Sequence, residues 1–340
     1  MSSSNYNYRE ILPSTDLGNL IHTHKTSFWQ SPLWAQILNK THQAKSIYIV
    51  SGENHSFLIE RRTIINKFTG LYMLGIDGES LSDACLVFIR ENIATKNDLF
   101  LQIEPLSPLS NSVVSSTTRA PFRRFIEPVT ALLQLGDISE ETLLSSFAEK
   151  GRYNIRLAQK RGVTTRWVQG SDIEKTTGKT YVEAFFDLLD ETTKRDGFAH
   201  NSLSYYQHFI ETLESYHAGG LLVAEKDGIL HAAGIFAYWG DTAIYYYGAS
   251  SSDTMIRRDM ATYLLQWEAI REGMRRGCKT YDFLGISADG KGKLAGVTEF
   301  KLRFNPEKKY WPQENIIIFR PILLKLLQTV SKMRKLIQGR

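Results

Sequence analysis

The sequence predicts a mixed α/β (α+β) fold organised in two domains, and three observations lead to this prediction. At 340 residues the chain is long enough to form two hydrophobic cores. Its apolar fraction of 42% and charged fraction of 23% are ordinary for a soluble globular protein. Runs with the two-residue period of strands and runs with the 3.6-residue period of helices follow one another along the whole chain.

The first 130 residues contain both kinds of signal. Within residues 27–38, Ser31 can cap a helix and Pro32 suits its first position, ahead of apolar residues at helical spacing. The following patterns predict strands over 45–52 and 56–64 joined as a hairpin, a strand from residue 71 that breaks at two glycines, a helix over 81–92 and a strand over 98–106. The Ser/Thr/Pro-rich residues 107–120 predict a surface loop.

The second part of the chain begins with a predicted strand over 128–136 and a helix that Ser139 can cap. Later patterns predict helices over 180–195, 203–216 and 260–276, three antiparallel strands between residues 219 and 251 with turns at Asp227-Gly228 and Gly240-Asp241, and a strand over 279–287.

Charge and cysteine content limit the classes of function. The net charge of +5 permits an anionic partner without requiring one. Cys85 and Cys278 form no CxxC pair, and the histidines show no metal-ligand spacing, so we expect no metal and no cofactor. No signal peptide and no run of 18 apolar residues is visible. We therefore expect a cytoplasmic protein.

Two basic segments stand out. Residues 150–168 hold six basic residues and no acid, and Arg152, Arg156 and Lys160 recur at four-residue spacing on one helix face. This face is either solvated or a surface for the phosphates of RNA. The tail over 320–340 has the pattern of a basic amphipathic helix, which can lie on an anionic membrane, touch RNA or dock on its own protein.

Residues 296–304 (GVTEFKLRF) predict a short strand entered through a glycine turn. On a strand, Phe300 and Lys301 would point to opposite faces. The lysine is then either an edge-strand residue with its ammonium in water or a cation facing a cleft. In the run Tyr245-Tyr246-Tyr247, the first and third residues are expected on one face, where they either pack or line a ligand cleft.

Seven stretches in order over nearly the whole chain resemble the Fem-type (FemABX) peptidoglycan bridge aminoacyltransferases: FWQSPLWAQIL, LFLQIEPL, KGRYNIRLAQKRGV, RDGF, YYYGASS, LQWEAIREGMRRGCKTYDFLGIS and GVTEFKLRF. The resemblance implies two GNAT-like (acetyltransferase-type) domains around a cleft, without a long coiled-coil insertion. The implied domains are 1–130 with 311–340, which bind the acceptor, and 131–310 on the aminoacyl-tRNA side.

The resemblance also implies the reaction. An amino acid passes from aminoacyl-tRNA to an amine of a peptidoglycan precursor stem peptide, which is UDP-linked or lipid-linked. Negative charge develops on the ester carbonyl oxygen during the attack, and a fixed cation near it lowers the barrier. The Phe-Lys pair of the family matches Phe300 and Lys301, so Lys301 would be that cation and Phe300 would shape the site. The basic tail favours a position at the inner face of the membrane.

Other family positions map onto this chain as substrate contacts. Tyr72 and Asp77 match residues that line the acceptor site, and Asp77 is expected to bind the attacking amine or assist its deprotonation. Tyr205 matches a ligand-binding tyrosine, and Tyr245 or Tyr247 matches an aromatic strand. Arg152, Arg156 and Lys160 would contact tRNA. Asn201 stands where the family often has a phosphate-binding arginine, which departs from the pattern for a nucleotide-linked acceptor.

Two alternatives remain open. An acyl-CoA N-acyltransferase would need a Gly-rich loop before a helix, and the corresponding residues 257–265 (RRDMATYLL) contain no glycine. A non-catalytic RNA- or membrane-binding protein would keep the basic segments but would have no use for the Phe300-Lys301 pair.

Overall fold

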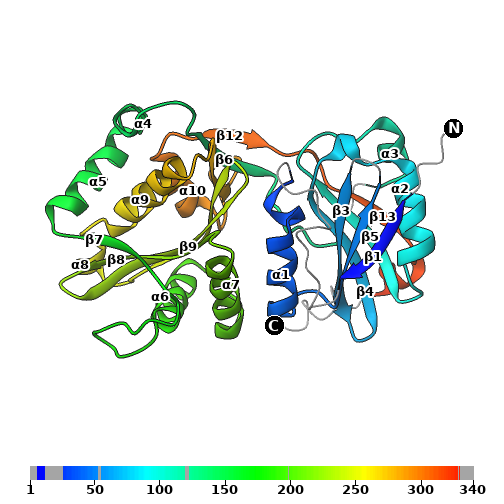
Figure 1. Cartoon of the computed structure of the whole chain (residues 1–340), viewed down its shortest axis with the longest axis horizontal. Coiled ribbons are helices and arrows are strands. Elements are labelled where there is room, and N and C mark those ends of the chain that lie inside the picture. The colour runs from blue at the N-terminus through cyan, green and yellow to red at the C-terminus, as the bar shows by residue number, and fades with distance from the viewer. Residues whose placement is uncertain are drawn as a thin grey trace. The chain divides into compact units, whose positions relative to one another are not determined.

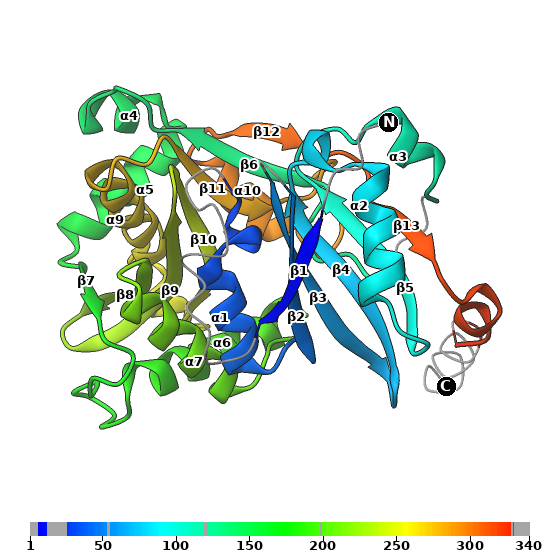
Figure 2. The ribbon, with the colours of Figure 1, turned by 45° about the vertical axis from the view of Figure 1, so that its right-hand side comes forward.

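The computed structural model describes residues 6–11, 26–52, 55–118, 122–197, 199–327 and 329. The chain divides into two compact units, each built on one sheet (Figures 1 and 2). Unit 1 comprises Met1–Ile126 with Trp311–Arg340, and unit 2 comprises Glu127–Tyr310. Helices and strands are mixed in both units, which confirms the predicted α/β class.

The sheet of unit 1 has the strand order β1-β2-β3-β4-β5-β13. Neighbouring strands are antiparallel except β4 and β5, which are parallel because α2 lies in the crossover between them. The last strand, β13, comes from the far end of the chain and pairs with β5. The strands are β1 (Asn7–Ile11), β2 (Ser46–Ser51), β3 (Ser56–Ile65), β4 (Phe68–Ile76), β5 (Asp98–Pro105) and β13 (Asn315–Ile318).

Helices α1 and α2 lie on opposite faces of this sheet (Figure 1). The predicted start of α1 is confirmed, because Ser31 Oγ accepts the backbone N–H of Trp34 at 3.0 Å and Pro32 follows the cap. The helices are η1 (Phe28–Gln30), α1 (Pro32–Thr41), η2 (Gly78–Ser80), α2 (Asp83–Phe88), the π-helical η3 (Ile89–Ile93) and α3 (Asn111–Ser115). Helix α3 interrupts the predicted loop over 107–120.

The sheet of unit 2 has the order β12-β6-β11-β10-β9-β8-β7. Strands β10 and β11 are parallel, with α9 in the crossover, and the other pairs are antiparallel. The predicted turns at Asp227-Gly228 and Gly240-Asp241 are confirmed between β8, β9 and β10. The strands are β6 (Val129–Gln134), β7 (Thr164–Val168), β8 (Gly219–Lys226), β9 (Ile229–Trp239), β10 (Thr242–Ser250), β11 (Thr280–Gly285) and β12 (Glu307–Tyr310).

Helices α5 and α9 lie on one face of this second sheet, and α6 and α7 lie on the other (Figure 1). The predicted helices over 180–195, 203–216 and 260–276 are confirmed with small shifts of their ends. The helices of unit 2 are α4 (Glu140–Ser146), α5 (Glu149–Lys160), α6 (Tyr181–Asp196), α7 (Leu203–Ser215), α8 (Thr254–Arg257), α9 (Ala261–Arg275) and α10 (Ala295–Leu302).

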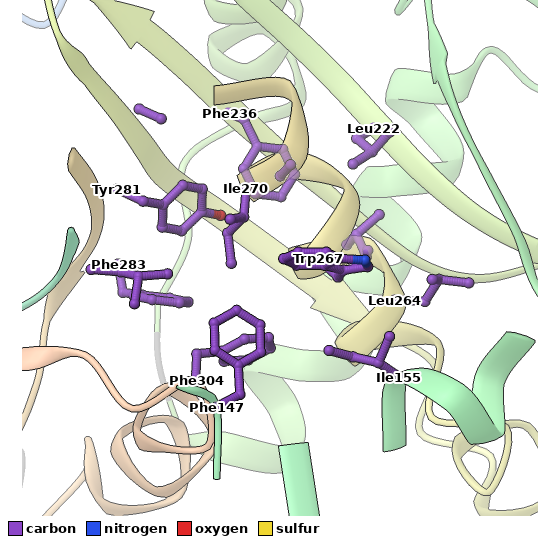
Figure 3. Close-up of a cluster of buried hydrophobic side chains, with 14 of the residues drawn as sticks. Phe147, Ile155, Leu222, Phe236, Leu264, Trp267, Ile270, Tyr281, Phe283 and Phe304 are labelled. Atoms are coloured by element: carbon purple, nitrogen blue, oxygen red, sulfur yellow. The ribbon is translucent and has the colours of Figure 1, made fainter. Parts of the chain in front are cut away.

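The core on the α9 face of unit 2 gathers aromatic side chains from distant parts of the chain (Figure 3). Phe147 follows α4, and its ring lies edge-on to Trp267 of α9 with centroids 5.5 Å apart. Phe304 follows α10 and contacts both Phe147 and Phe283 with centroids 5.3 Å away. Phe304 therefore anchors the end of α10 in the core.

The prediction of a strand over 296–304 is wrong, because these residues form α10 and the turn that follows it. The strand was predicted as one entered through a glycine turn at Gly296, but Gly296 lies within the first turn of α10. The helical signal was the pair Phe300 and Phe304, which are four residues apart and pack together with centroids at 5.6 Å. Adjacent residues on a helix are rotated by about 100°, so Phe300 and Lys301 do not point in opposite directions.

The expectation that Tyr245 and Tyr247 share a face is also wrong. Strand β10 has a bulge between them, because Tyr245 pairs with Phe236 whereas Tyr247 pairs with the adjacent Ile235. Tyr245 stacks on Phe236 on the α9 face, at 5.4 Å between centroids. Tyr247 lies against Tyr206 of α7 at 5.1 Å. The extra residue in the bulge places the two tyrosines on opposite faces.

The predicted basic helix over 320–340 lies only partly within the described residues, of which 321–327 are helical. Leu324 is buried, whereas Ile322 and Leu326 are exposed. None of the helices in the described ranges combines the length and the apolar character that crossing a bilayer requires.

We predict that Phe304→Ala will lower the free energy of unfolding by about 3–5 kcal/mol, because it removes a fully buried ring from this core. Tyr153→Ala, at a 61% exposed site on α5, is the matched control and should change stability by about 0.5 kcal/mol or less. Urea unfolding of the two variants provides the test. Equal effects at both sites would contradict the anchoring role of Phe304.

Candidate active site

Lys301 occupies a buried position on α10, next to a break in β11. Its side chain is only 6% exposed, and Nζ donates hydrogen bonds to the carbonyl oxygens of Gly285 at 2.8 Å and Leu284 at 3.3 Å. The pairing of β11 with β6 is irregular at this point, and Leu284 adopts a left-handed φ of 58°. Successive carbonyls of a regular strand point in opposite directions, so only the break can present both to one ammonium.

Two acids accompany this ammonium. Asp282 is buried and accepts hydrogen bonds from Thr130 Oγ1 and, at 2.7 Å, from the backbone N–H of Leu284. Burial raises the pKa of Asp282, and these hydrogen bonds together with the charge of Lys301 oppose the rise. Glu127 packs on Gly285 so closely that a Cβ there would lie 2.4 Å from its Cγ, which requires glycine at this position.

Burial also sets the proton affinity of the lysine. It lowers the pKa of Lys301 from its usual 10.5 to about 8, while the charges of Asp282 and Glu127 oppose the decrease. The group therefore remains a cation at neutral pH and loses its proton in mildly alkaline solution.

A pocket of about 340 Å³ lies near this cation. Tyr245, Gln266 and Phe300 are among its lining residues, whereas Lys301 itself is not. The Lys301 Nζ is 5.9 Å from the centroid of the Tyr245 ring. Gln266 is buried and accepts a hydrogen bond from Tyr281 Oη at 2.7 Å. Burial raises the pKa of Tyr245 to about 12, so its hydroxyl stays protonated. The pocket thus combines aromatic walls and neutral polar groups with the charged residues Arg195, Asp196, Arg257 and Lys293, and the Lys301 ammonium lies nearby.

A second cavity of about 510 Å³ shares Phe300 and Arg257 with this pocket. It lies between α5, the first turn of α9 and α10, and its lining is rich in basic side chains.

Tyr205 and Tyr247 come together on the α7 face, where their hydroxyl oxygens are 3.0 Å apart. Asn201 Nδ2 lies 3.5 Å from Tyr247 Oη, and the backbone N–H of Asn201 donates to Tyr206 Oη at 3.2 Å. Burial raises the pKa of Tyr205 well above 10. The structure therefore groups Tyr205 with Tyr247 and Asn201, whereas Tyr245 lies with Phe300 and Lys301.

The two sequence-predicted residues of unit 1 lie in different surroundings. Tyr72 on β4 is 1% exposed, and its ring packs edge-on against Phe125 at 5.0 Å and Phe100 at 5.5 Å. Asp77 follows β4 and is exposed. Partial burial raises its pKa, but hydrogen bonds from Ser107 and Ser80 outweigh this, so the pKa lies below the usual value. Asp77 is thus an accessible carboxylate, and Tyr72 is a core residue.

The basic face of α5 is divided. The Arg152 guanidinium donates to the carbonyl oxygens of Phe147 and Ser145, where it caps the end of α4. Arg156 and Lys160 are exposed. Only these two residues of the predicted trio are therefore available for an anionic ligand.

Several residues of the site were missed in the sequence. Gln266 lies within a helical pattern that marks it only as a core-facing position, and Arg257 and Arg258 were considered only for the glycine that they lack. Arg257 ends α8 and Arg258 follows it, shortly before α9 begins at Ala261. The signal for both arginines was this position near a helix start, where basic side chains and free backbone N–H groups can meet.

Comparison with known proteins finds sequence matches over part of the chain and structural matches over nearly the whole chain. The family model of the FemAB family matches residues 125–225 and 217–332, which is more than half of the chain. "Lipid II:glycine glycyltransferase" of Staphylococcus haemolyticus (strain JCSC1435) is 22% identical over 246 residues, covering 52% of this chain. The match spans 55% of that relative, so the chain corresponds to about half its length.

Two solved structures show the fold. The crystal structure of FemX superposes with a TM-score of 0.77 at 16% identity, over 94% of this chain and 99% of FemX. A tandem GNAT protein from the clavulanic acid biosynthesis pathway gives a TM-score of 0.50 at 10% identity, over 92% and 98% of the two chains. The expected GNAT-like character of the fold is thereby confirmed.

The pKa of Lys301 predicts a pH-dependent stability difference between the wild type and Lys301→Met. Below pH 8 both folded and unfolded states carry the charge, and the folded protein bears the full penalty of burying it, which corresponds to about 3 kcal/mol. Between pH 8 and 10.5 the unfolded state binds more protons, so this penalty is lost as the pH rises. The stability advantage of the methionine variant should therefore shrink from pH 7 to pH 10.

Chemical unfolding at pH 7, 8, 9 and 10 measures this difference. Lys175→Met, which removes a charge from an exposed site in the same unit, is the control. A difference for Lys301→Met that stays constant across the series would contradict a buried, titrating ammonium.

Proposed function

Because the chain belongs to the FemAB family, we propose that it transfers an amino acid from aminoacyl-tRNA to an amine of a peptidoglycan precursor stem peptide. This reaction would build a cross-bridge of the cell wall. The observation that carries the proposal is the fixed ammonium of Lys301 beside the pocket that Tyr245 and Phe300 line. Acyl transfer benefits from such a charge, since the ester carbonyl oxygen becomes negative in the transition state.

The bonding changes define what the residues must do. The amine nitrogen attacks the ester carbonyl carbon, a C–N bond forms and the C–O bond to the terminal ribose breaks. The amine loses a proton and the released ribose hydroxyl gains one. Lys301, held by two carbonyl oxygens, stays positive at neutral pH and stabilises the oxyanion electrostatically. The Phe300 and Tyr245 rings bound the acyl group and exclude water, which would otherwise hydrolyse the ester.

The acceptor is proposed to be a lipid-linked stem peptide. The name of the Staphylococcus haemolyticus relative contains lipid II, which favours a lipid-linked over a UDP-linked acceptor. Asp77 is an exposed carboxylate of lowered pKa and suits the binding of an incoming ammonium. Tyr72 would support that site from the core, and the Tyr205–Tyr247 hydroxyl pair offers further polar contacts. The basic tail would hold the protein at the inner face of the membrane.

A transfer assay tests the proposal directly. Radiolabelled aminoacyl-tRNAs are combined with UDP-linked and lipid-linked stem peptides, and label is expected in the lipid-linked product. Lys301→Met should lower kcat by about 100-fold or more, as loss of an oxyanion-stabilising group does. Lys175→Met should retain the wild-type rate. Near-normal turnover of the Lys301 variant would remove the catalytic assignment, and transfer from acyl-CoA instead of aminoacyl-tRNA would establish the alternative donor.

The face of α5 gives a separate prediction about tRNA. Replacing Arg156 and Lys160 with glutamine removes two exposed charges, so tRNA should bind more weakly and the slope of log K against log salt should become shallower by about 1–2. Arg152→Gln should reduce thermal stability through the loss of its bonds to α4, with a smaller effect on tRNA binding. Filter binding at several salt concentrations distinguishes tRNA binding by Arg156 and Lys160 from the structural role of Arg152. Unchanged tRNA affinity of the double variant would show that this face of α5 is solvent-exposed and does not contact tRNA.

A further inference from the structure

We infer that the exposed ring of Tyr153 on α5 is a stacking platform for an unpaired base near the 3′ end of the donor tRNA. This inference rests on the proposed function, and it deepens that function by assigning a contact to a nucleobase, in addition to the expected contacts of basic side chains with phosphates.

Helix α5 has one buried side and one open side. Gly151, Asn154, Ile155 and Ala158 are buried, and they recur at the three- and four-residue spacing of a single helix side. Tyr153 lies on the other side, where it is 61% exposed. Among the described residues it takes part in no hydrogen bond and no ring contact. The ring therefore contributes little to the fold and is free to contact a partner.

Cations flank this ring along the helix. Lys150 lies three residues before Tyr153 and Arg156 lies three residues after it, so both are its neighbours on the helix surface. Lys160 follows Arg156 by four residues. All three cations are exposed, and no described carboxylate forms an ion pair with them. The one acid of α5 is Glu149, in its first turn. Proteins bind single-stranded nucleic acid with this combination, because the cations attract the backbone and the ring stacks on a base.

Helix α5 is held next to the candidate active site. A Cβ at Gly151 would collide with the carbonyl oxygen of Arg303, so the glycine allows α5 to pack directly on the residue that follows α10. Lys150 lines the cavity of about 510 Å³, which shares Phe300 with the pocket near Lys301. The open side of α5 therefore begins next to a cavity that adjoins the candidate active site.

The chemistry of the proposed donor supplies a partner for the ring. In aminoacyl-tRNA the ester is carried by the terminal adenosine, and further unpaired nucleotides precede it. With the ester near Lys301, these nucleotides extend over the neighbouring surface of unit 2. Their bases expose the aromatic faces that a tyrosine ring can stack on.

An anionic membrane would also attract these cations, but the helix does not suit a membrane. A helix that lies on a bilayer needs a broad apolar face. Tyr153 is the one large apolar side chain of α5 that is exposed, since Ile155 and Ala158 are buried. A single ring among cations therefore favours RNA over a lipid surface.

A double-mutant cycle between the ring and the bases tests the inference. The probe is an unacylated RNA hairpin with a single-stranded CCA end, and abasic versions of it each lack one of these bases but keep every phosphate. Tyr153→Ala should weaken binding of the intact probe by about 5-fold or more, as expected for the loss of one stacked base. One abasic probe should bind the wild type equally weakly and lose no further affinity with the variant, because ring and base form one contact.

Further variants distinguish stacking from other roles. Tyr153→Phe keeps the ring and should bind RNA like the wild type, whereas Tyr153→Leu should behave like Tyr153→Ala. These changes remove no charge, so the slope of log K against log salt should stay unchanged, unlike that of the Arg156 and Lys160 double variant. In the transfer assay, Tyr153→Ala should raise KM for aminoacyl-tRNA more than it lowers kcat.

Tyr216→Ala is the matched control. Tyr216 is 44% exposed and follows α7, on the other face of the sheet from α5. Its replacement should change RNA affinity less than about twofold. Thermal unfolding of each variant confirms that the fold is intact.

Each outcome decides a different point. Wild-type RNA affinity of Tyr153→Leu, or equal weakening of every abasic probe by Tyr153→Ala, overturns stacking. Unchanged RNA affinity of Tyr153→Ala, in a protein that transfers amino acids from aminoacyl-tRNA, overturns the inference and leaves the proposed function intact. A wild type that binds no RNA and transfers from acyl-CoA overturns both. If Tyr153→Ala lowers binding to phosphatidylglycerol vesicles and not to RNA, the ring contacts membrane and the inference is wrong.

Discussion

The hydrogen bonds from the Lys301 ammonium to the carbonyl oxygens of Leu284 and Gly285 are the interaction on which the site in unit 2 depends. Removing an ammonium from water costs several kcal/mol, so a buried lysine persists only where oxygens compensate its charge. The break in β11 provides that compensation, because it turns two consecutive carbonyls toward one point. The left-handed Leu284 is part of this break, and glycine is required at position 285 because the Glu127 side chain packs directly on it.

The core explains how the ammonium is held in place. Helix α10 is fixed at its end by Phe304 within the aromatic cluster of Figure 3. Near the middle of the helix the Thr298 hydroxyl accepts the backbone N–H of Ser287 at 2.8 Å, which ties the helix to the segment after β11. The helix and the strand break are therefore positioned against each other by independent contacts. Phe300, on the same helix, is thereby placed at the boundary of both cavities.

A comparable arrangement of buried polar groups occurs in unit 1, at the segment that leads into unit 2. Glu104 on β5 accepts the backbone N–H groups of Phe125 at 3.1 Å and Ile126 at 2.7 Å. Burial raises the pKa of Glu104 to about 7, and these hydrogen bonds oppose the rise. Gln102, two residues earlier on the same strand, accepts the N–H of Phe122 at 2.9 Å. Gln102 and Glu104 of β5 thus hold the backbone of residues 122–126. In the sequence they are visible only as two polar residues within an apolar run.

By itself, the sequence determined the elements whose signals are local. The Ser31 cap and the glycine turns between β8, β9 and β10 were predicted because cap and turn residues act on their immediate neighbours. Tertiary structure alone decided the helical state of α10, the bulge at Tyr246 and the partners of Lys301. The physical reason is that these features depend on packing against Phe147, on strand pairing and on carbonyl directions, which are set by segments distant in the chain.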